Sequence, residues 1–228
     1  MIVSIHQPNY LPWIGYFDKI AKSDVFVIFD DVQYPRGKKG FFGNRNQIKT
    51  NNGKMWLTVP VLGKSEFKNF NDIEINYNGW NEKHIQNIYN FYKKAPYFDN
   101  YFESIKSILT KKYSNLSDLS ISLILYFMKV LDINTKVMYS SSFKTEKTGG
   151  NKILYILEQL NATEYISGTG PGSLRYINEK DFSDRGIKLN WQDYNHPVYK
   201  QLHGEFISHL SVIDLIFING YKSKEVIT

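Results

Sequence analysis

Polar side chains suited to acid–base chemistry follow the first two apolar runs of the chain, at the points where these runs stop. They are a histidine, two carboxamides and two carboxylates: His6, Gln7, Asn9, Asp30 and Asp31. A histidine that donates one ring N–H to a carboxylate can offer its other nitrogen to a ligand, as a general base requires. We therefore predict that His6 is a base oriented by Asp30 or Asp31. The alternative is that these groups only cap a helix or satisfy a turn.

Two later segments carry further candidate ligand contacts. In SGTGPGSLRY, residues 167–176, the backbone of Gly168, Thr169 and Gly170 would allow the close approach of an anion. The alternating glycines do not match G-x-G-x-x-G, so a dinucleotide site is not supported, and a plain turn is the alternative. The segment NHPVYKQLHGEF provides four polar candidates: His196, Tyr199, Gln201 and His203. Its histidines lack the spacing of metal ligands, so we predict no metal site, and ordinary packing is the alternative.

These candidates need a fold that brings distant segments together. Apolar runs at 2–5 and 24–29, joined by an amphipathic helix at 13–22, are typical of a βαβ unit and predict a parallel sheet. In such sheets ligands bind beyond the carboxyl ends of the strands, where the loops meet. After this unit, an Asn-Gly pair between residues 44–49 and 55–61 indicates a β-hairpin.

Helices are predicted over about 80–132, with a break at Ala95-Pro96 and a cap at Ser117-Asp118. Strands are then expected at 136–143, 164–167 and 187–191, and helices at 151–160 and 205–218. His84 and His209 would lie inside helices and are interpreted as structural. The sequence thus predicts a single α/β domain over 1–228, with a parallel Rossmann-like sheet, a β-hairpin and a helical insertion.

Composition and charge narrow the class of protein. Hydrophobic residues at 42% and charged residues at 22% are typical of a globular chain, and the absence of cysteine excludes disulfides and thiolate chemistry. Without a leader or a membrane-length apolar run, we expect a cytoplasmic protein with no integral membrane segment. Between Asp31 and Glu66 the chain has no acidic residue but seven basic ones: Arg36, Lys38, Lys39, Arg45, Lys49, Lys54 and Lys64. Because no nucleic-acid-binding motif accompanies this segment, it favours a small phosphorylated ligand over nucleic acid. A solvated basic loop is the alternative.

The chain resembles the WbqC-like family, small bacterial proteins encoded among O-antigen and other surface-polysaccharide genes. Four segments carry the resemblance: HQPNYLPWIGYFDKI, SDVFVIFDDVQY, NRNQIKT with WLTVPV, and HPVYKQLHGEF through SVIDLIFING. They cover nearly the whole length. The resemblance implies a biosynthetic pathway rather than one defined reaction.

Residues 12–29 are also remotely similar to the start of HxGH nucleotidyltransferases, which implies a nucleotidyltransferase-like fold. Trp13 and Tyr16 stand where those enzymes have their two phosphate-binding histidines, and Gly15 is retained. The later YISGTGPGSLR occupies the place of their Ser/Thr-rich phosphate loop. Because both histidines are missing, nucleotidyl transfer by that mechanism is not expected, and fold alone does not give function.

Together these observations favour a transferase that acts on a nucleotide-linked amino sugar, with N-acyl transfer as the preferred reaction. The basic segment would hold the diphosphate, and three aromatic side chains would stack on base or sugar: Tyr10, Trp13 and Tyr16. Gln33 and the run Asn44-Arg45-Asn46 complete the expected substrate contacts. No cofactor is evident, whereas an acyl donor such as acyl-CoA or an acyl carrier protein is implied, and oligomerisation stays open. The alternatives are a non-catalytic nucleotide-sugar binding or assembly component, or a degenerate nucleotidyltransferase-like enzyme.

Overall fold

The computed structural model describes residues 1–35, 42–63 and 67–227. Its main sheet is parallel and five-stranded, and it contains β1 (Ile2–His6), β2 (Val25–Ile28), β5 (Lys136–Tyr139), β6 (Glu164–Ser167) and β7 (Lys188–Trp191). Helices flank this sheet, and the predicted α/β fold with a parallel Rossmann-like core is confirmed.

The strand order is β5-β2-β1-β6-β7. The chain therefore moves outward from β1 through β2 to β5, and it then continues on the other side of β1 with β6 and β7. This reversal creates a topological switch point between β1 and β6. In open α/β sheets, ligands bind beyond the carboxyl ends of the strands at such a point.

Helices cover both faces of the sheet, which explains why its strands are continuous apolar runs. In β2, Val25 and Val27 pack on the face covered by α5 (Gly149–Gln159) and α7 (Glu179–Ser183). Phe26 and Ile28 pack on the opposite face with α1 (Ile14–Ala21). Because side chains alternate along a strand, each core receives every second residue.

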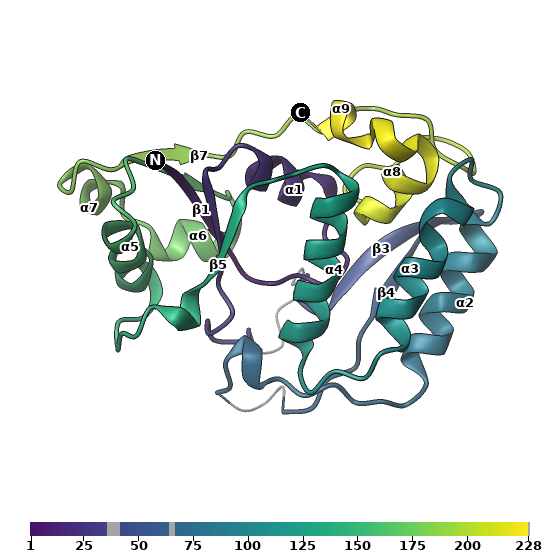
Figure 1. Cartoon of the computed structure of the whole chain (residues 1–228), viewed down its shortest axis with the longest axis horizontal. Helices are drawn as coiled ribbons and strands as arrows, with labels where there is room; N and C mark the ends of the chain where they lie inside the picture. Colours follow the sequence, from purple (N-terminus) through teal and green to yellow (C-terminus); the bar gives the residue numbers. More distant parts are fainter. Residues whose placement is uncertain (36–41, 64–66, 228) are drawn as a thin grey trace.

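Between β2 and β5 the chain forms a hairpin, a short 3₁₀ helix and three longer helices. These elements are β3 (Arg45–Thr50), β4 (Gly53–Thr58), η1 (Phe70–Asp72), α2 (Trp80–Tyr92), α3 (Phe98–Thr110) and α4 (Leu116–Val130). Figure 1 shows α2 and α3 at the opposite end of the molecule from α5 and α7. The predicted hairpin is confirmed, and the first helix ends before Ala95-Pro96 as expected.

The cap of α4 differs from the prediction. The capping residue is Asn115, whose side chain accepts a hydrogen bond of 2.8 Å from the Asp118 backbone N–H. Ser117 and Asp118 lie instead in the first turn of the helix, where Asp118 suits the positive end of the helix dipole. This placement leaves the Ser117 hydroxyl unused by the cap.

The C-terminal part of the chain contains η2 (Ser140–Ser142), α6 (Pro171–Tyr176), α8 (Val212–Asn219), η3 (Gly220–Lys222) and α9 (Ser223–Ile227). The helix expected over 205–218 begins only at Val212, because His209 has a left-handed φ of 62° that a helix excludes. His209 is therefore a loop residue, and the prediction that it lies inside a helix was wrong. No helix in the described ranges is long and apolar enough to cross a bilayer.

Candidate functional site

The loops after β1 and β6 leave the same edge of the sheet. The two strands are parallel neighbours, with Ser4 opposite Ile166, so His6 and Gly168 each lie two residues further along. Neighbouring strands are about 4.8 Å apart. The glycine-rich loop and His6 therefore share one edge of the sheet, and this edge is the switch point.

Lys19 of α1 lies at this junction, although the sequence patterns did not single it out. The residue is 1% exposed, and a Cβ atom built on Gly168 would lie 3.8 Å from Lys19 Nζ. Burial lowers the pKa of Lys19 from 10.5 to about 7, because the protein interior disfavours the charged form. Within the described residues, no hydrogen bond or ion pair compensates the Lys19 ammonium group.

The neighbouring charge on α1 provides a contrast. Asp18 is also 1% exposed, but its carboxylate is 2.7 Å from Lys22 Nζ and accepts a hydrogen bond of 3.0 Å from the side chain of Gln192. Buried charges in proteins are normally paired in this way. The uncompensated ammonium of Lys19 is therefore the unusual feature of the helix, and it is a natural place for an anion.

The burial of Lys19 was not predicted, because the amphipathic pattern of α1 implied that one face of the helix, with Lys19 on it, is exposed to solvent. In the structure every residue from Ile14 to Ile20 is buried. The helix packs between the sheet and the C-terminal segment, which a local pattern does not reveal. The signal that was present in the sequence is a lysine beside Asp18 in a short helix whose other residues are mostly apolar.

His6 does not form the expected pair with an aspartate. Its Nδ1 atom is 3.0 Å from the Gln7 carbonyl oxygen, and because a carbonyl only accepts, Nδ1 carries the proton and Nε2 the lone pair. The His6 ring also contacts the Tyr16 ring edge-on, with centroids 4.8 Å apart. Burial and the nearby charge of Lys19 lower the pKa of His6 to about 3. His6 is therefore a neutral and weakly basic imidazole at pH 7.

Asp30 and Asp31 point toward β5 and α5 instead of toward His6. Asp30 accepts hydrogen bonds from the hydroxyls of Ser140 at 2.9 Å and Ser141 at 2.6 Å. Asp31 binds Ser140 and is 2.5 Å from Lys152 Nζ. These contacts join the ends of β2 and β5 to α5. Asp30 and Asp31 follow β2, which neighbours both β1 and β5. The sequence alone does not predict toward which of these two strands the side chains point.

The tyrosines expected to stack on a ligand are core residues. Tyr10 is fully buried, and its hydroxyl is 2.9 Å from His84 Nδ1. Tyr16 is 2% exposed and donates a hydrogen bond of 3.1 Å to the Gln7 carbonyl. Neither ring presents a free face, so the expected stacking role is wrong for both. His84 lies in α2 and is buried, in agreement with its structural interpretation.

Trp13 is partly exposed and packs against the C-terminal segment. Its ring stacks on His209 at 4.9 Å and on His196 at 6.2 Å between centroids. The indole also covers Gly15, where an added Cβ atom would lie 2.2 Å from a Trp13 ring carbon. Gly15 is thus required by close packing, a reason independent of any nucleotidyltransferase motif.

Two polar residues of the hairpin region bind backbone carbonyl oxygens of the chain segments that pack against it. The side-chain amides of Asn44 and Asn46 donate hydrogen bonds to the carbonyl oxygens of Val59 and Leu11, at 2.8 and 2.6 Å. Each bond uses one N–H of the amide, and both side chains are buried, so these asparagines help to hold the hairpin, while a substrate contact through them stays a prediction. Arg45 lies on the same hairpin, with its guanidinium carbon 4.4 Å from the centroid of the Trp56 ring. A phosphate contact by Arg45 stays a prediction.

Substrate contacts by three further residues near the loops stay predictions. Gln7 is partly buried, and its carbonyl binds His6 and Tyr16. The side-chain oxygen of Asn9 is buried and has no hydrogen-bond partner within the described residues. Gln33 is exposed. Four basic residues of the acid-free segment lie outside the described residues: Arg36, Lys38, Lys39 and Lys64.

Tyr199 and Gln201 belong to a buried network and not to a ligand site. Asp214 on α8 is fully buried and accepts hydrogen bonds from the hydroxyls of Tyr92 at 2.8 Å and Tyr199 at 2.9 Å. Gln201 accepts a hydrogen bond of 2.9 Å from Lys49 Nζ. The network joins the hairpin, α2 and the C-terminal segment, and it explains why these polar residues follow one another in an irregular stretch.

The two histidines of the same stretch also have internal contacts. His203 Nε2 is 3.0 Å from the Phe91 carbonyl, and His196 Nδ1 is 2.9 Å from the Pro197 carbonyl. The other nitrogen of His196 is buried without a partner among the described residues. In the described ranges no three His, Asp or Glu residues gather in a way that could hold a metal ion.

Comparison with known proteins gives a consistent relationship. Residues 7–226 match the WbqC-like protein family. The chain is 34% identical over 226 residues to Uncharacterized protein Rv1507c of Mycobacterium tuberculosis, and the alignment covers 98% of this chain and 96% of that protein. No solved structure matches the chain. Since the match extends over nearly the whole sequence, the chain belongs to the WbqC-like protein family.

Proposed function

We propose that the crevice between the carboxyl ends of β1 and β6 binds the phosphate groups of a nucleotide-linked sugar, with Lys19 as the cation that faces them. The observation that carries this proposal is the buried ammonium of Lys19, which has no partner in the described residues. A buried charge is costly unless an opposite charge compensates it, and a bound phosphate would supply that charge.

The surroundings of Lys19 support the same ligand. Gly168 has no side chain, and the nearest heavy atom to a Cβ built there is Lys19 Nζ at 3.8 Å, so a small anion could approach both. His6 is neutral at pH 7 and adds no competing positive charge. The topological switch point is also where phosphates of nucleotides bind in many α/β proteins.

The proposed activity is group transfer in surface-polysaccharide biosynthesis, with N-acyl transfer from acyl-CoA or an acyl carrier protein to a sugar amine. A proton acceptor works best when its pKa is near the working pH. The pKa of His6 is about 3, far below this range, so His6 is a poor proton acceptor at pH 7, and Lys19 keeps its proton while it binds the phosphates. The weak basicity of His6 also favours a second candidate function, non-catalytic binding of the nucleotide sugar.

The test compares Lys19→Met with Lys49→Met. Both lysines are 1% exposed, but Lys49 has internal hydrogen-bond partners and Lys19 has none in the described residues. We expect Lys19→Met to weaken the binding of nucleoside diphosphates and their sugar conjugates by about 10- to 100-fold, the loss of a charged hydrogen bond. The same change should raise the free energy of unfolding of the free protein by about 1–3 kcal/mol, because an uncompensated charge is removed.

Lys49→Met is the matched control. It should lower the free energy of unfolding by about 1–3 kcal/mol, because Gln201 and the Glu205 carbonyl both lose the ammonium group that donates to them, and it should leave ligand affinity unchanged. Titration calorimetry and urea unfolding would measure both effects. Equal ligand affinities for the parent and Lys19→Met would contradict the proposed phosphate site.

A further inference from the structure

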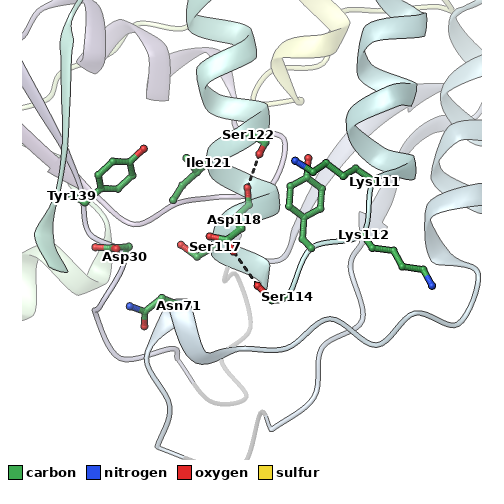
Figure 2. A pocket seen from close by; sticks show the side chains of 11 residues that line it. Asp30, Asn71, Lys111, Lys112, Ser114, Ser117, Asp118, Ile121, Ser122 and Tyr139 are labelled. Carbon is green, nitrogen blue, oxygen red and sulfur yellow. Dashed lines mark hydrogen bonds between the residues drawn. The ribbon is translucent and has the colours of Figure 1, made fainter. Parts of the chain in front are cut away.

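A pocket of about 490 Å³ opens at the N-terminal end of α4, at the same edge of the sheet as the switch point (Figure 2). Asp30, two residues beyond β2, and Tyr139, the last residue of β5, form one side of it. Ser117 and Asp118 of α4 line the pocket together with Asn71. Its volume is in the range of small-molecule sites.

Two buried polar atoms in this pocket lack partners. Ser117 is 1% exposed, and its hydroxyl has no hydrogen-bond partner in the described parts of the chain. Figure 2 shows this hydroxyl turned toward the side where Asp30 lies. The side-chain oxygen of Asn71 is likewise buried and unpartnered there. Since buried polar atoms are normally hydrogen-bonded, both are open positions for the hydroxyl groups of a ligand.

The chemistry of the lining suits a sugar ring. The carboxylates of Asp30 and Asp118 accept hydrogen bonds, the serine hydroxyl both donates and accepts, and the rings of Tyr113 and Tyr139 offer apolar surface. A sugar presents alternating hydroxyl groups and C–H faces that match this combination. The formal charges of the two carboxylates are balanced by two lysines in the same lining, Lys111 and Lys112, so the pocket suits a neutral sugar ring better than a phosphate.

We propose that this pocket holds the monosaccharide unit of the nucleotide-linked ligand, while the phosphates lie at Lys19. This inference rests on the proposed function. β2 neighbours β1, and β5 neighbours β2, so the pocket residues Asp30 and Tyr139 follow strands one and two spacings of about 4.8 Å from the strand of His6. A diphosphate-linked sugar can extend over such a separation.

The test compares Ser117→Ala with Ser120→Ala. Ser120 lies on the same helix and is equally buried and unpartnered in the described residues, but it does not line the pocket. The probes are UDP, dTDP and GDP, each with and without an attached hexose or N-acetylhexosamine, measured by titration calorimetry. We expect at least one sugar conjugate to bind the parent about tenfold more tightly than its bare diphosphate.

Ser117→Ala should abolish this gain and keep the affinity for the bare diphosphate, whereas Ser120→Ala should keep both. Each variant removes only an unpartnered hydroxyl, so the midpoint temperature of thermal unfolding of both variants should equal or exceed that of the parent. A sugar-dependent gain that survives in Ser117→Ala, or is missing in the parent, would overturn the pocket assignment while leaving the Lys19 site intact. Failure of every bare diphosphate to bind the parent would overturn both proposals.

Discussion

The affinity for a nucleotide sugar should fall about tenfold for each pH unit between pH 7 and pH 9, and Lys19→Met should abolish this pH dependence. The pKa of Lys19 in the free protein is about 7, so its side chain becomes neutral above this pH. A bound phosphate favours the charged ammonium, and binding must then take up one proton. Each further pH unit makes that proton ten times scarcer.

A sugar conjugate is the right probe, because a terminal phosphate monoester has its own pKa near 6 whereas a linked diphosphate keeps its charge over this range. Calorimetry in buffers of different ionisation enthalpy would count the protons taken up on binding. The expected value at pH 8.5 is close to one proton for the parent and close to zero for Lys19→Met. Affinity that is flat from pH 7 to pH 9 in the parent would contradict a titrating Lys19 in the site.

The free protein should show the opposite trend in stability. The pKa of Lys19 is about 7 in the folded state and about 10.5 in the unfolded chain, so the unfolded state binds more protons between these values. The free energy of unfolding therefore rises with pH in this window, by up to about 1.4 kcal/mol per pH unit. The stability difference between Lys19→Met and the parent should accordingly shrink as the pH rises from 7 to 10.5.

Asp214→Ala should lower the free energy of unfolding by about 3–5 kcal/mol, the usual cost of breaking a buried polar network by removing one member. Asp214 is fully buried and accepts hydrogen bonds from Tyr92 and Tyr199. Burial raises the pKa of Asp214, while these hydroxyls and the charge of Lys49 oppose the rise. Its removal leaves two tyrosine hydroxyls without an acceptor and creates a cavity.

Urea unfolding of Asp214→Ala and of Glu158→Ala would measure this effect against an exposed pair. Glu158 is 2.8 Å from Arg185, and both side chains are 42% exposed, so its loss should cost less than about 1 kcal/mol. Similar small losses for the two variants would show that the network around Asp214 does not hold the C-terminal segment. A large loss would confirm that Tyr199 and Gln201 are structural.

The strands of the main sheet were predictable, because a buried parallel strand is a short apolar run with clear ends. β6 was predicted at 164–167 and is found at Glu164–Ser167. The start of α8 at Val212 was not predictable from a local pattern. The loop before it contains residues in the left-handed conformation, such as His203 and His209. These two histidines contact Phe91 and Trp13, which are distant in sequence, so a local pattern carries no signal of this loop.

In the candidate site, too, some features were predictable from the sequence and others depended on tertiary packing. His6 and Gly168 could be placed at one edge, since the parallel arrangement of their strands followed from the βαβ pattern. The direction of the Asp30 side chain could not be predicted, because β2 has a neighbour on each side. The serines of η2, which follows β5, bind the Asp30 carboxylate in place of His6. Lys19 was missed because its burial comes from tertiary packing on every side of α1.

The pKa of Lys19 decides directly whether this residue is a buried cation that binds phosphate, and it can be measured from the NMR shift of the labelled side-chain carbon beside the amine. We expect a pKa of about 7 in the free protein and a higher value when inorganic pyrophosphate is bound. Lys19→Met would identify the resonance. Two results would contradict the proposed phosphate site at Lys19. One is a pKa near 10.5 in the free protein, and the other is a pKa that does not change at a saturating concentration of pyrophosphate.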